Sequence, residues 1–284
     1  MASALRPKPL MPPATDSGPR LRDAALLGLL HGPAELLPIS SSGHATLLPW
    51  LLGLPYSTLP SERRKAIEVA LHAGTAAALV AAPPTTPVDM PPQAKSLALS
   101  VLMLAPTAAV GLLGRRVISK RLGTPATVAA GLAAGSAALV FADSLNGKRT
   151  TVDFSASDAL LIGVAQAPSL WPGVSRSAMT ITAARSRGFA AGDAARISRS
   201  GVVPASFAAV ALEAAVAFKD GGAPRDLAAC GVAAAAAFCS TIASRGLVGR
   251  LERGTQLWPW ALLRCTTATA TVLRIRSNGN DGVQ

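Results

Sequence analysis

Charged residues are scarce in this sequence. They make up 15% of its 284 residues, whereas 50% of the residues are hydrophobic. A water-soluble domain of this length carries about 25% charged residues, so the chain has too little polar surface to coat a soluble globule. Aromatic residues are also rare, at 4%. The hydrophobic content comes mostly from Ala, Leu and Val, and small residues let helices pack closely within a membrane.

Cysteine is nearly absent too. Cys230, Cys239 and Cys265 lie inside apolar stretches without the spacing of metal ligands, and we interpret them as small hydrophobic residues. Residues 1–20 hold five prolines and no continuous apolar run, so this segment lacks the apolar core of a signal peptide and is expected to be a disordered tail. A second tail is expected over 277–284.

Positive charge is in excess, with a formal net charge of +12. In a soluble protein this excess would indicate nucleic-acid binding. In a membrane protein the same arginines face anionic lipid headgroups from the loops, and we favour this interpretation. The expected partners are therefore membrane lipids and not nucleic acid.

Six apolar segments are long enough to cross a membrane. A spanning helix needs about 20 mostly apolar residues, with a lower limit near 17. Charged clusters or breakers such as Pro83-Pro84 and Gly221-Gly222 mark the segment ends. We predict transmembrane helices over Ala66–Ala82, Leu97–Gly114, Pro125–Ala142, Gly201–Phe218, Leu227–Ser244 and Leu257–Leu273.

Two further apolar stretches, Ala24–Leu54 and Ala159–Ala184, are interrupted by prolines, serines and an ionisable residue. The first interruption reads PISSSGH over Pro38–His44, and the second reads PGVSRS over Pro172–Ser177. Non-helical backbone at membrane depth persists only where protein or a watery cavity satisfies its polar groups. Each stretch is therefore predicted to be a re-entrant helix–loop–helix hairpin.

The two interrupted stretches match each other at a constant spacing along the chain. The matched residues are Gly28, His31 and Pro33 with Gly163, Gln166 and Pro168. Each stretch precedes three of the six predicted spans, so a second copy of this unit would insert upside down, as in transporters with inverted repeats. The predicted fold is an all-α integral membrane protein with a single domain over 21–276 and repeats at about 24–142 and 158–273.

Ionisable residues within apolar segments are costly, so each is a candidate for function. Four of them stand out: His31, Glu35, His44 and Arg176. Arg176 and its flanking serines open an apolar run, where a guanidinium fork, hydroxyls and helix N-terminal N–H groups favour phosphate. The Ser40–Ser42 run supplies similar donors beside His44. The two interruptions are therefore predicted to form one site for a lipid-linked phosphate.

Structural roles are the alternative for several polar residues. Serines at a helix start commonly cap it, so Ser40 and Ser42 could be caps. Arg176 could pair with Glu35 only to hold the fold. His72, in the first predicted span, is typical of a packed, hydrogen-bonded histidine more than of a ligand. We interpret Arg264, in the last span, as snorkelling toward the membrane interface.

The interrupted segments also carry a family resemblance. Residues Gly28–His44, GLLHGPAELLPISSSGH, closely resemble the first signature of the bacterial undecaprenyl-diphosphate phosphatase family of the bacitracin-resistance type. Residues Gln166–Ile181, QAPSLWPGVSRSAMTI, resemble its second signature. The resemblance implies six spans with two re-entrant hairpins, a multi-pass protein of the bacterial plasma membrane, and a hydrolase that removes the terminal phosphate of undecaprenyl diphosphate. It also implies a divalent cation, Mg²⁺ or Ca²⁺; a homodimer is compatible with the sequence.

The resemblance assigns roles residue by residue. It implies catalytic roles for Glu35, Ser41, His44 and Arg176, and a polyprenyl diphosphate as the bound partner. The expected phosphate-binding residues are Ser40, Ser42, Gly173, Ser175 and Ser177.

The chain departs from the family signatures at four positions. His31 replaces the first motif glutamate and Ala34 replaces a threonine. Ala178 replaces a glycine, and Arg196 replaces a glutamate further along the chain. Glu35 and His31 are the expected metal ligands, but His31 replaces an oxygen ligand suited to Mg²⁺ or Ca²⁺. Imidazole prefers softer metals. The alternative from a different class is a lipid-phosphate transporter or a catalytically impaired paralogue.

Overall fold

All regular structure described in this computed structural model is helical, apart from one isolated bridge between Arg149 and Phe189. The structure describes residues 19–82, 93–219 and 226–280. The longer helices are α1 (Leu21–Leu36), α2 (Ser41–Leu51), α3 (Ser61–Ala81), α4 (Gln93–Arg121), α5 (Pro125–Asp143), α6 (Ala156–Ala165), α7 (Arg176–Ser186), α8 (Ala191–Ser200), α9 (Val202–Lys219), α10 (Leu227–Ala243), α11 (Arg245–Glu252) and α12 (Trp258–Asn280). Short 3₁₀ turns lie at Pro55–Thr58, Thr151–Asp153 and Ala167–Leu170. The prediction of an all-α fold is confirmed.

Each predicted span coincides with one helix: α3, α4, α5, α9, α10 and α12. By length and hydropathy, however, only α4 (Leu97–Gly114) and α5 (Pro125–Asp143) qualify as spans among the described residues. The bent pair α10–α11 adds a third if it is counted as one span. Helix α12 carries Arg264 and several threonines in its interior, which lower its hydropathy. The count of six spans therefore stays a prediction.

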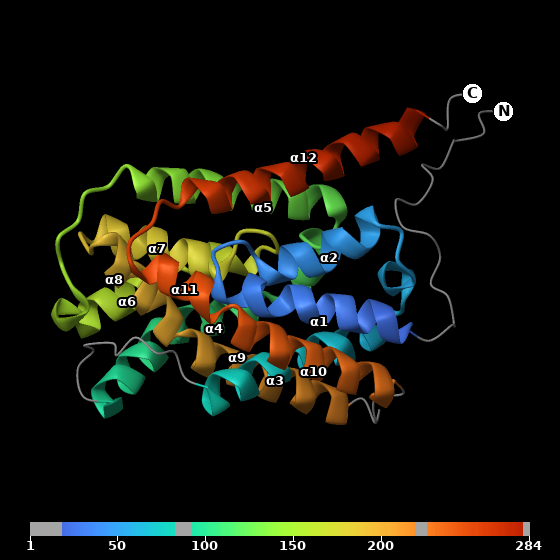
Figure 1. Ribbon diagram of the computed structural model, residues 1–284, viewed down its shortest axis with the longest axis horizontal. Helices are drawn as coiled ribbons and strands as arrows, with labels where there is room; N and C mark the ends of the chain where they lie inside the picture. The colour runs from blue at the N-terminus through green and yellow to red at the C-terminus, as the bar shows by residue number, and fades with distance from the viewer. Residues whose placement is uncertain (1–18, 83–92, 220–225, 281–284) are drawn as a thin grey trace.

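Both interrupted stretches form helix–loop–helix pairs. Helix α1 ends at Leu36 and α2 begins at Ser41, while α6 and the turn at Ala167–Leu170 precede α7, which begins at Arg176. Figure 1 shows α1 and α6 entering the bundle from opposite ends, with α2 and α7 returning toward the end from which each pair came. Whether these pairs are re-entrant in a membrane stays a prediction.

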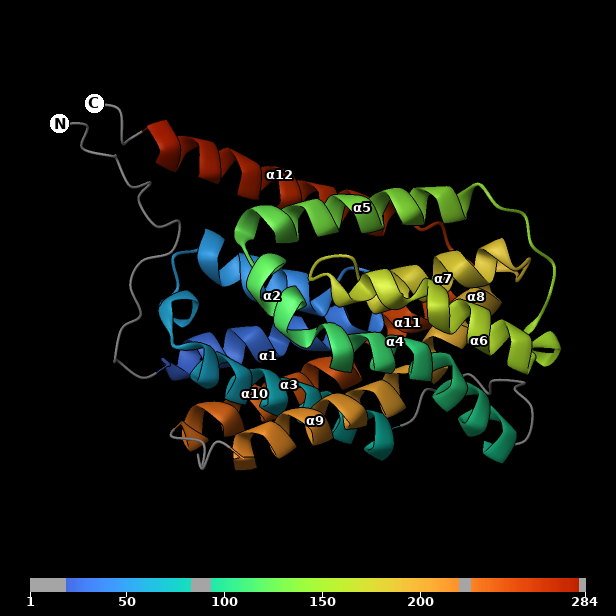
Figure 2. The same cartoon turned by 180° about the vertical axis from the view of Figure 1, so that it is seen from behind.

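The helices form three layers, with the interrupted pairs in the middle. Helices α5 and α12 lie side by side on one face, and α3, α9 and α10 cover the opposite face (Figures 1 and 2). Between them, α1 and α2 meet α6 and α7 end to end. This arrangement places both loops inside the bundle, away from its surface.

The contacts between helices follow the predicted repeat. Helix α1 packs on α10 and α6 packs on α4, while α2 packs on α12 and α7 packs on α5. The matched glycines serve the same purpose, because a Cβ at Gly28 would meet the Ala233 carbonyl of α10 and one at Gly163 would meet the Met103 carbonyl of α4. Each interrupted pair thus packs against predicted spans of the other repeat, so the two repeats interlock.

Close helix contacts in this bundle depend on glycine. A Cβ at Gly74 of α3 would clash with the Ala234 carbonyl oxygen of α10. We expect Gly74→Ala to lower the free energy of unfolding by about 1–3 kcal/mol, because over-packing forces the helices apart. Thermal unfolding in detergent measures this change. Gly231→Ala in α10 is the control, since a Cβ there meets nothing within 4 Å; equal losses in both variants would contradict the explanation.

Three details differ from the sequence-based expectation. The C-terminal tail was predicted from 277, but α12 continues to Asn280 because extending a formed helix fixes only one more residue per hydrogen bond. The short helices α8 and α11 were not predicted; each buries one apolar face against the bundle. Most of the predicted N-terminal tail, residues 1–18, lies outside the described residues.

Candidate active site

Two serines with the same unusual backbone open the returning helices. Ser40 precedes α2 with φ 79°, and Ser175 precedes α7 with φ 76°. Each hydroxyl caps its helix, accepting a hydrogen bond from the N–H of Gly43 at 3.2 Å and of Ala178 at 3.3 Å. Positive φ is uncommon outside glycine and is often found at functional sites. Both serines are buried caps. The capping role that was the structural alternative for Ser40 is thus observed.

A buried arginine joins the two loops. Arg264 of α12 is fully buried. It donates to the carbonyl oxygens of Pro38 in the first loop at 2.9 Å, and of Gly173 and Val174 in the second at 2.8 and 2.9 Å. It also donates to Leu132 O and Ser136 Oγ on α5. The interpretation of Arg264 as a snorkelling residue is wrong, because its guanidinium points inward and replaces water as the partner of the loop carbonyls.

The loops place Glu35, Ser41 and Arg176 together. The Ser41 hydroxyl donates to Glu35 Oε2 at 2.6 Å, and Arg176 Nη2 lies 4.0 Å from Glu35 Oε1. Arg176 Nη1 donates to Ser198 O at 3.2 Å, whereas its buried Nη2 has no hydrogen-bond partner among the described residues. A guanidinium with an unused donor beside a serine hydroxyl and a carboxylate is suited to bind a phosphoryl group. The phosphate-binding role of Arg176 stays a prediction, and so does its alternative role as a structural partner of Glu35.

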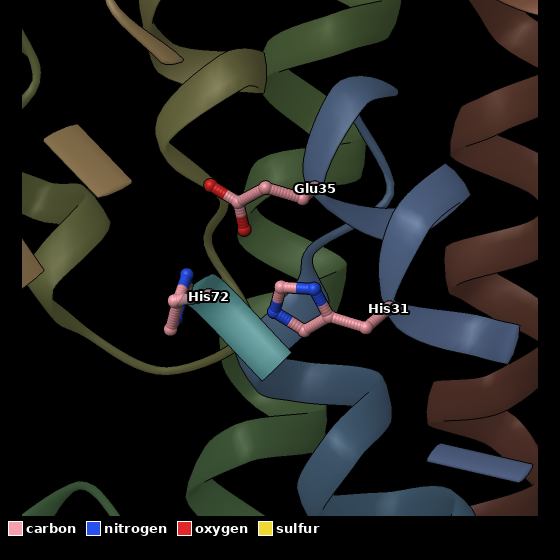
Figure 3. Close-up of side chains that lie close together, drawn as sticks. All are labelled: His31, Glu35 and His72. Atoms are coloured by element: carbon pink, nitrogen blue, oxygen red, sulfur yellow. The ribbon is translucent and has the colours of Figure 1, made fainter. Parts of the chain in front are cut away.

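Two histidines lie next to this group. His31 and Glu35 of α1 and His72 of α3 point toward one another in Figure 3. The rings of His31 and His72 meet edge to face, with centroids 4.7 Å apart. His31 Nδ1 hydrogen-bonds with Thr75 Oγ1 at 3.0 Å, so it has a partner on α3.

Comparison with known proteins gives the family. The family described as bacitracin resistance protein BacA matches residues 24–270. The chain belongs to this family. It is 37% identical over 187 residues to the undecaprenyl-diphosphatase of Elusimicrobium minutum. This match covers 62% of this chain and 69% of the Elusimicrobium protein. The undecaprenyl-diphosphatase of Geobacter sulfurreducens is 37% identical over 191 residues, which are 62% of this chain and 68% of the Geobacter protein. The undecaprenyl-diphosphatase of Sorangium cellulosum is 34% identical over 205 residues, which are 67% of this chain and 65% of the Sorangium protein.

Other residues to which the family resemblance gave roles are placed differently. Both ring nitrogens of His44 are engaged, Nδ1 with Ser40 O at 2.9 Å and Nε2 with Thr267 Oγ1 at 3.3 Å. His44 therefore ties the first loop to α12, and no hydrogen bond joins it to Glu35 in the described chain. Ser42 is exposed. Ser177 is buried in the first turn of α7, beside Arg176.

Gly173 has a structural reason to be glycine. Its φ is +100°, and a Cβ there would clash with the Val128 carbonyl oxygen of α5. Its own carbonyl accepts from Arg264. The phosphate-binding role of Gly173 stays a prediction. Its glycine lets the second loop pass close to α5.

Sequence reasoning did not find two members of this site, Arg264 and His72. The signal for Arg264 was a single guanidinium in the interior of an apolar run, which membrane proteins seldom leave unpaired. His72 gave a weaker signal, because an isolated histidine in a span has many structural uses.

The donor atoms of the clustered side chains can be compared with those that the expected divalent cation prefers. Mg²⁺ and Ca²⁺ take oxygen ligands, several of them carboxylates. Of the clustered groups His31, Glu35 and His72, only Glu35 supplies a carboxylate. This set does not match the preference of Mg²⁺ or Ca²⁺, and the expected role of these two ions stays a prediction.

Proposed function

We propose that this chain hydrolyses undecaprenyl diphosphate to undecaprenyl phosphate and inorganic phosphate. The observation that carries the proposal is the contact of Arg176, at the start of α7, with Glu35 of α1. The same carboxylate accepts the hydrogen bond of Ser41, at the start of α2. The family and its relatives named undecaprenyl-diphosphatase support the choice of substrate. The bacterial plasma membrane as its location is part of the proposal. The homodimer stays a prediction from the sequence.

The proposed reaction uses the chain's own side chains. Arg176 binds the terminal phosphate and stabilises charge that develops on its oxygens. Glu35 accepts the proton of the Ser41 hydroxyl, and Ser41 Oγ attacks the terminal phosphorus. The bond from this phosphorus to the bridging oxygen breaks, and undecaprenyl phosphate leaves with the electron pair. Protonated Glu35 gives its proton to the departing undecaprenyl phosphate and is again a carboxylate. It then deprotonates a water molecule that attacks the phosphoserine. Phosphate is released, and Glu35 passes the proton to Ser41 Oγ.

The test is phosphate release from undecaprenyl diphosphate by the purified full chain in detergent. We expect release by the wild-type protein and none by Glu35→Gln. Ser41→Ala separates attack by serine from attack by water, because full turnover in this variant would exclude the phosphoserine. Binding of the lipid by folded protein without phosphate release would reject the phosphatase and favour the carrier.

A groove on the outside of the bundle fits the lipid chain. Its volume is about 380 Å³, and it lies between α3 and α9. Its lining is almost entirely apolar: Ala73, Ala76, Ala77, Val80, Ala81, Phe207 and Val210. The groove begins one residue from His72 along α3. We propose that the first isoprenoid units lie here while the diphosphate reaches the loops.

Filling the groove should weaken binding of long chains. We expect Ala77→Trp to raise KM for undecaprenyl diphosphate about threefold to tenfold, because packing contacts with the chain are lost. The KM for a short-chain isoprenyl diphosphate should change less than twofold. Val140→Trp, at an exposed position on α5, is the control. An equal effect on both substrates would place the isoprenoid chain elsewhere.

A further inference from the structure

A third side chain accompanies the two residues that the family resemblance assigned to a cation. One ring nitrogen of His31, one of His72 and one carboxylate oxygen of Glu35 all lie within 4.8 Å of one another. Figure 3 shows the three side chains gathered around one space. His72 Nδ1 is buried and has no hydrogen-bond partner among the described residues. A buried polar atom without a partner is rare in proteins, so this nitrogen points to a missing ligand.

The surroundings of His31 match those of a metal-bound histidine. Its Nδ1 is engaged by Thr75 Oγ1 at 3.0 Å, and Thr241 of α10 in turn donates to Thr75 Oγ1 at 3.2 Å. Histidines that bind metals commonly donate their second N–H to an oxygen in this way, which fixes the tautomer and the ring orientation. With Nδ1 protonated toward Thr75, His31 Nε2 carries the free lone pair.

The set of donors selects the class of ion. We infer that His31, Glu35 and His72 bind one first-row transition-metal ion of the Zn²⁺ type. Two imidazoles with one carboxylate form a donor set that suits zinc, iron, cobalt or nickel, whereas Mg²⁺ and Ca²⁺ favour oxygen. A tetrahedral ion with bonds of about 2.1 Å holds its ligand atoms about 3.4 Å apart. Binding would therefore draw the three atoms, which lie within 4.8 Å of one another, closer together.

This inference rests on the proposed function only for the role of the ion. One coordination position beyond the three side chains would be open to water or to a phosphate oxygen, as in catalytic zinc sites with three protein ligands. Arg176, 4.0 Å from the same carboxylate, lies on the adjoining side. The ion and the guanidinium would then share the charge of the diphosphate.

A cavity is lined by two residues that adjoin the cluster. A cavity of about 320 Å³ is lined by Leu36, the neighbour of Glu35, and by Thr241, which hydrogen-bonds with Thr75. Its wall also carries the Arg199–Glu252 ion pair, so it is partly polar.

The test measures metal binding directly on the full chain in detergent, prepared without a histidine tag and stripped with a chelator. We expect one Co²⁺ per chain, a visible d–d absorption band, and displacement of this band by Zn²⁺ but not by millimolar Mg²⁺. His31→Gln and His72→Gln should each lose the band or weaken Zn²⁺ binding at least tenfold. The chain has three histidines, and His44→Gln is the matched control that should keep the band.

Two results would overturn the inference: folded wild-type protein that binds no stoichiometric Co²⁺ or Zn²⁺, or His72→Gln that binds them as tightly as the wild type. Elution as a single detergent-solubilised species and unchanged thermal unfolding of the stripped variants show that they are folded. Metal binding needs no substrate, so bound Zn²⁺ without phosphate release rejects the phosphatase alone. Phosphate release by stripped protein that binds neither ion rejects the metal site alone.

Discussion

Replacing Arg176 by alanine is expected to lower kcat for phosphate release by about 10³-fold or more, since arginines that stabilise a transferring phosphoryl group contribute effects of this size. Arg176 Nη2 is buried without a hydrogen-bond partner in the described chain, and no other guanidinium lies next to Glu35 and Ser41 there. Arg176→Lys should recover only a small part of the rate, because an ammonium group lacks the planar fork that matches phosphate. Initial rates of phosphate release measure both variants.

Arg196→Ala is the matched control for Arg176. Arg196 pairs with Asp193 three residues earlier on α8, at a partly exposed position, and its removal should leave kcat within twofold of the wild type. If Arg176→Ala kept kcat within tenfold of the wild type, the two loops would not form the phosphate site. The structural interpretation of the Arg176–Glu35 contact would then be correct.

Replacing Arg264 by methionine is expected to destabilise the fold and remove activity together. The change leaves the carbonyl oxygens of Pro38, Gly173 and Val174 without their donor inside the bundle. An unsatisfied buried polar group costs about 1–3 kcal/mol, so we expect a loss of about 3 kcal/mol or more. Thermal unfolding in detergent and phosphate release are the two measurements.

Arg274→Met provides the comparison on the same helix. Arg274 is only half-buried, donates to Leu51 O and lies 5.1 Å from the ring centre of Trp50. Its loss should cost less than about 1 kcal/mol, because water can reach the carbonyl that it leaves. Similar losses for the two variants would mean that Arg264 does not hold the loops through its hydrogen bonds.

The sequence predicted the helices and the two interruptions well, because both are local properties. A run of apolar residues between charges or prolines is visible in any window, and the PISSSGH and PGVSRS segments break such runs at Pro38–His44 and Pro172–Ser177. The match of Gly28 with Gly163 indicated the repeat, and both glycines let a helix pack closely on its neighbour. These features depend on neighbours in the chain or on a simple repeat.

The residues that sequence reasoning missed depend on distant partners. Arg264 was assigned to the interface because nothing in its own helix shows that carbonyls from both loops and α5 surround it. His72 was assigned a packing role because its contact with His31 joins α3 to α1 and follows no helical spacing. His44 was assigned a catalytic role by the family resemblance, and nothing near it in the chain shows that its ring hydrogen-bonds with Thr267 of the last helix.

The interlocking of the two repeats determines when during synthesis each helix can find its packing partner. Helix α1 carries Gly28, whose carbonyl accepts a hydrogen bond from Ser240 of α10, 212 residues later in the chain. Helix α12, which brings Arg264 to both loops, is made later still. Until α10 has been made, the face of α1 that packs on it lacks this partner. A truncated product that lacks the last helix would thus contain every residue of both signatures and still have no active site.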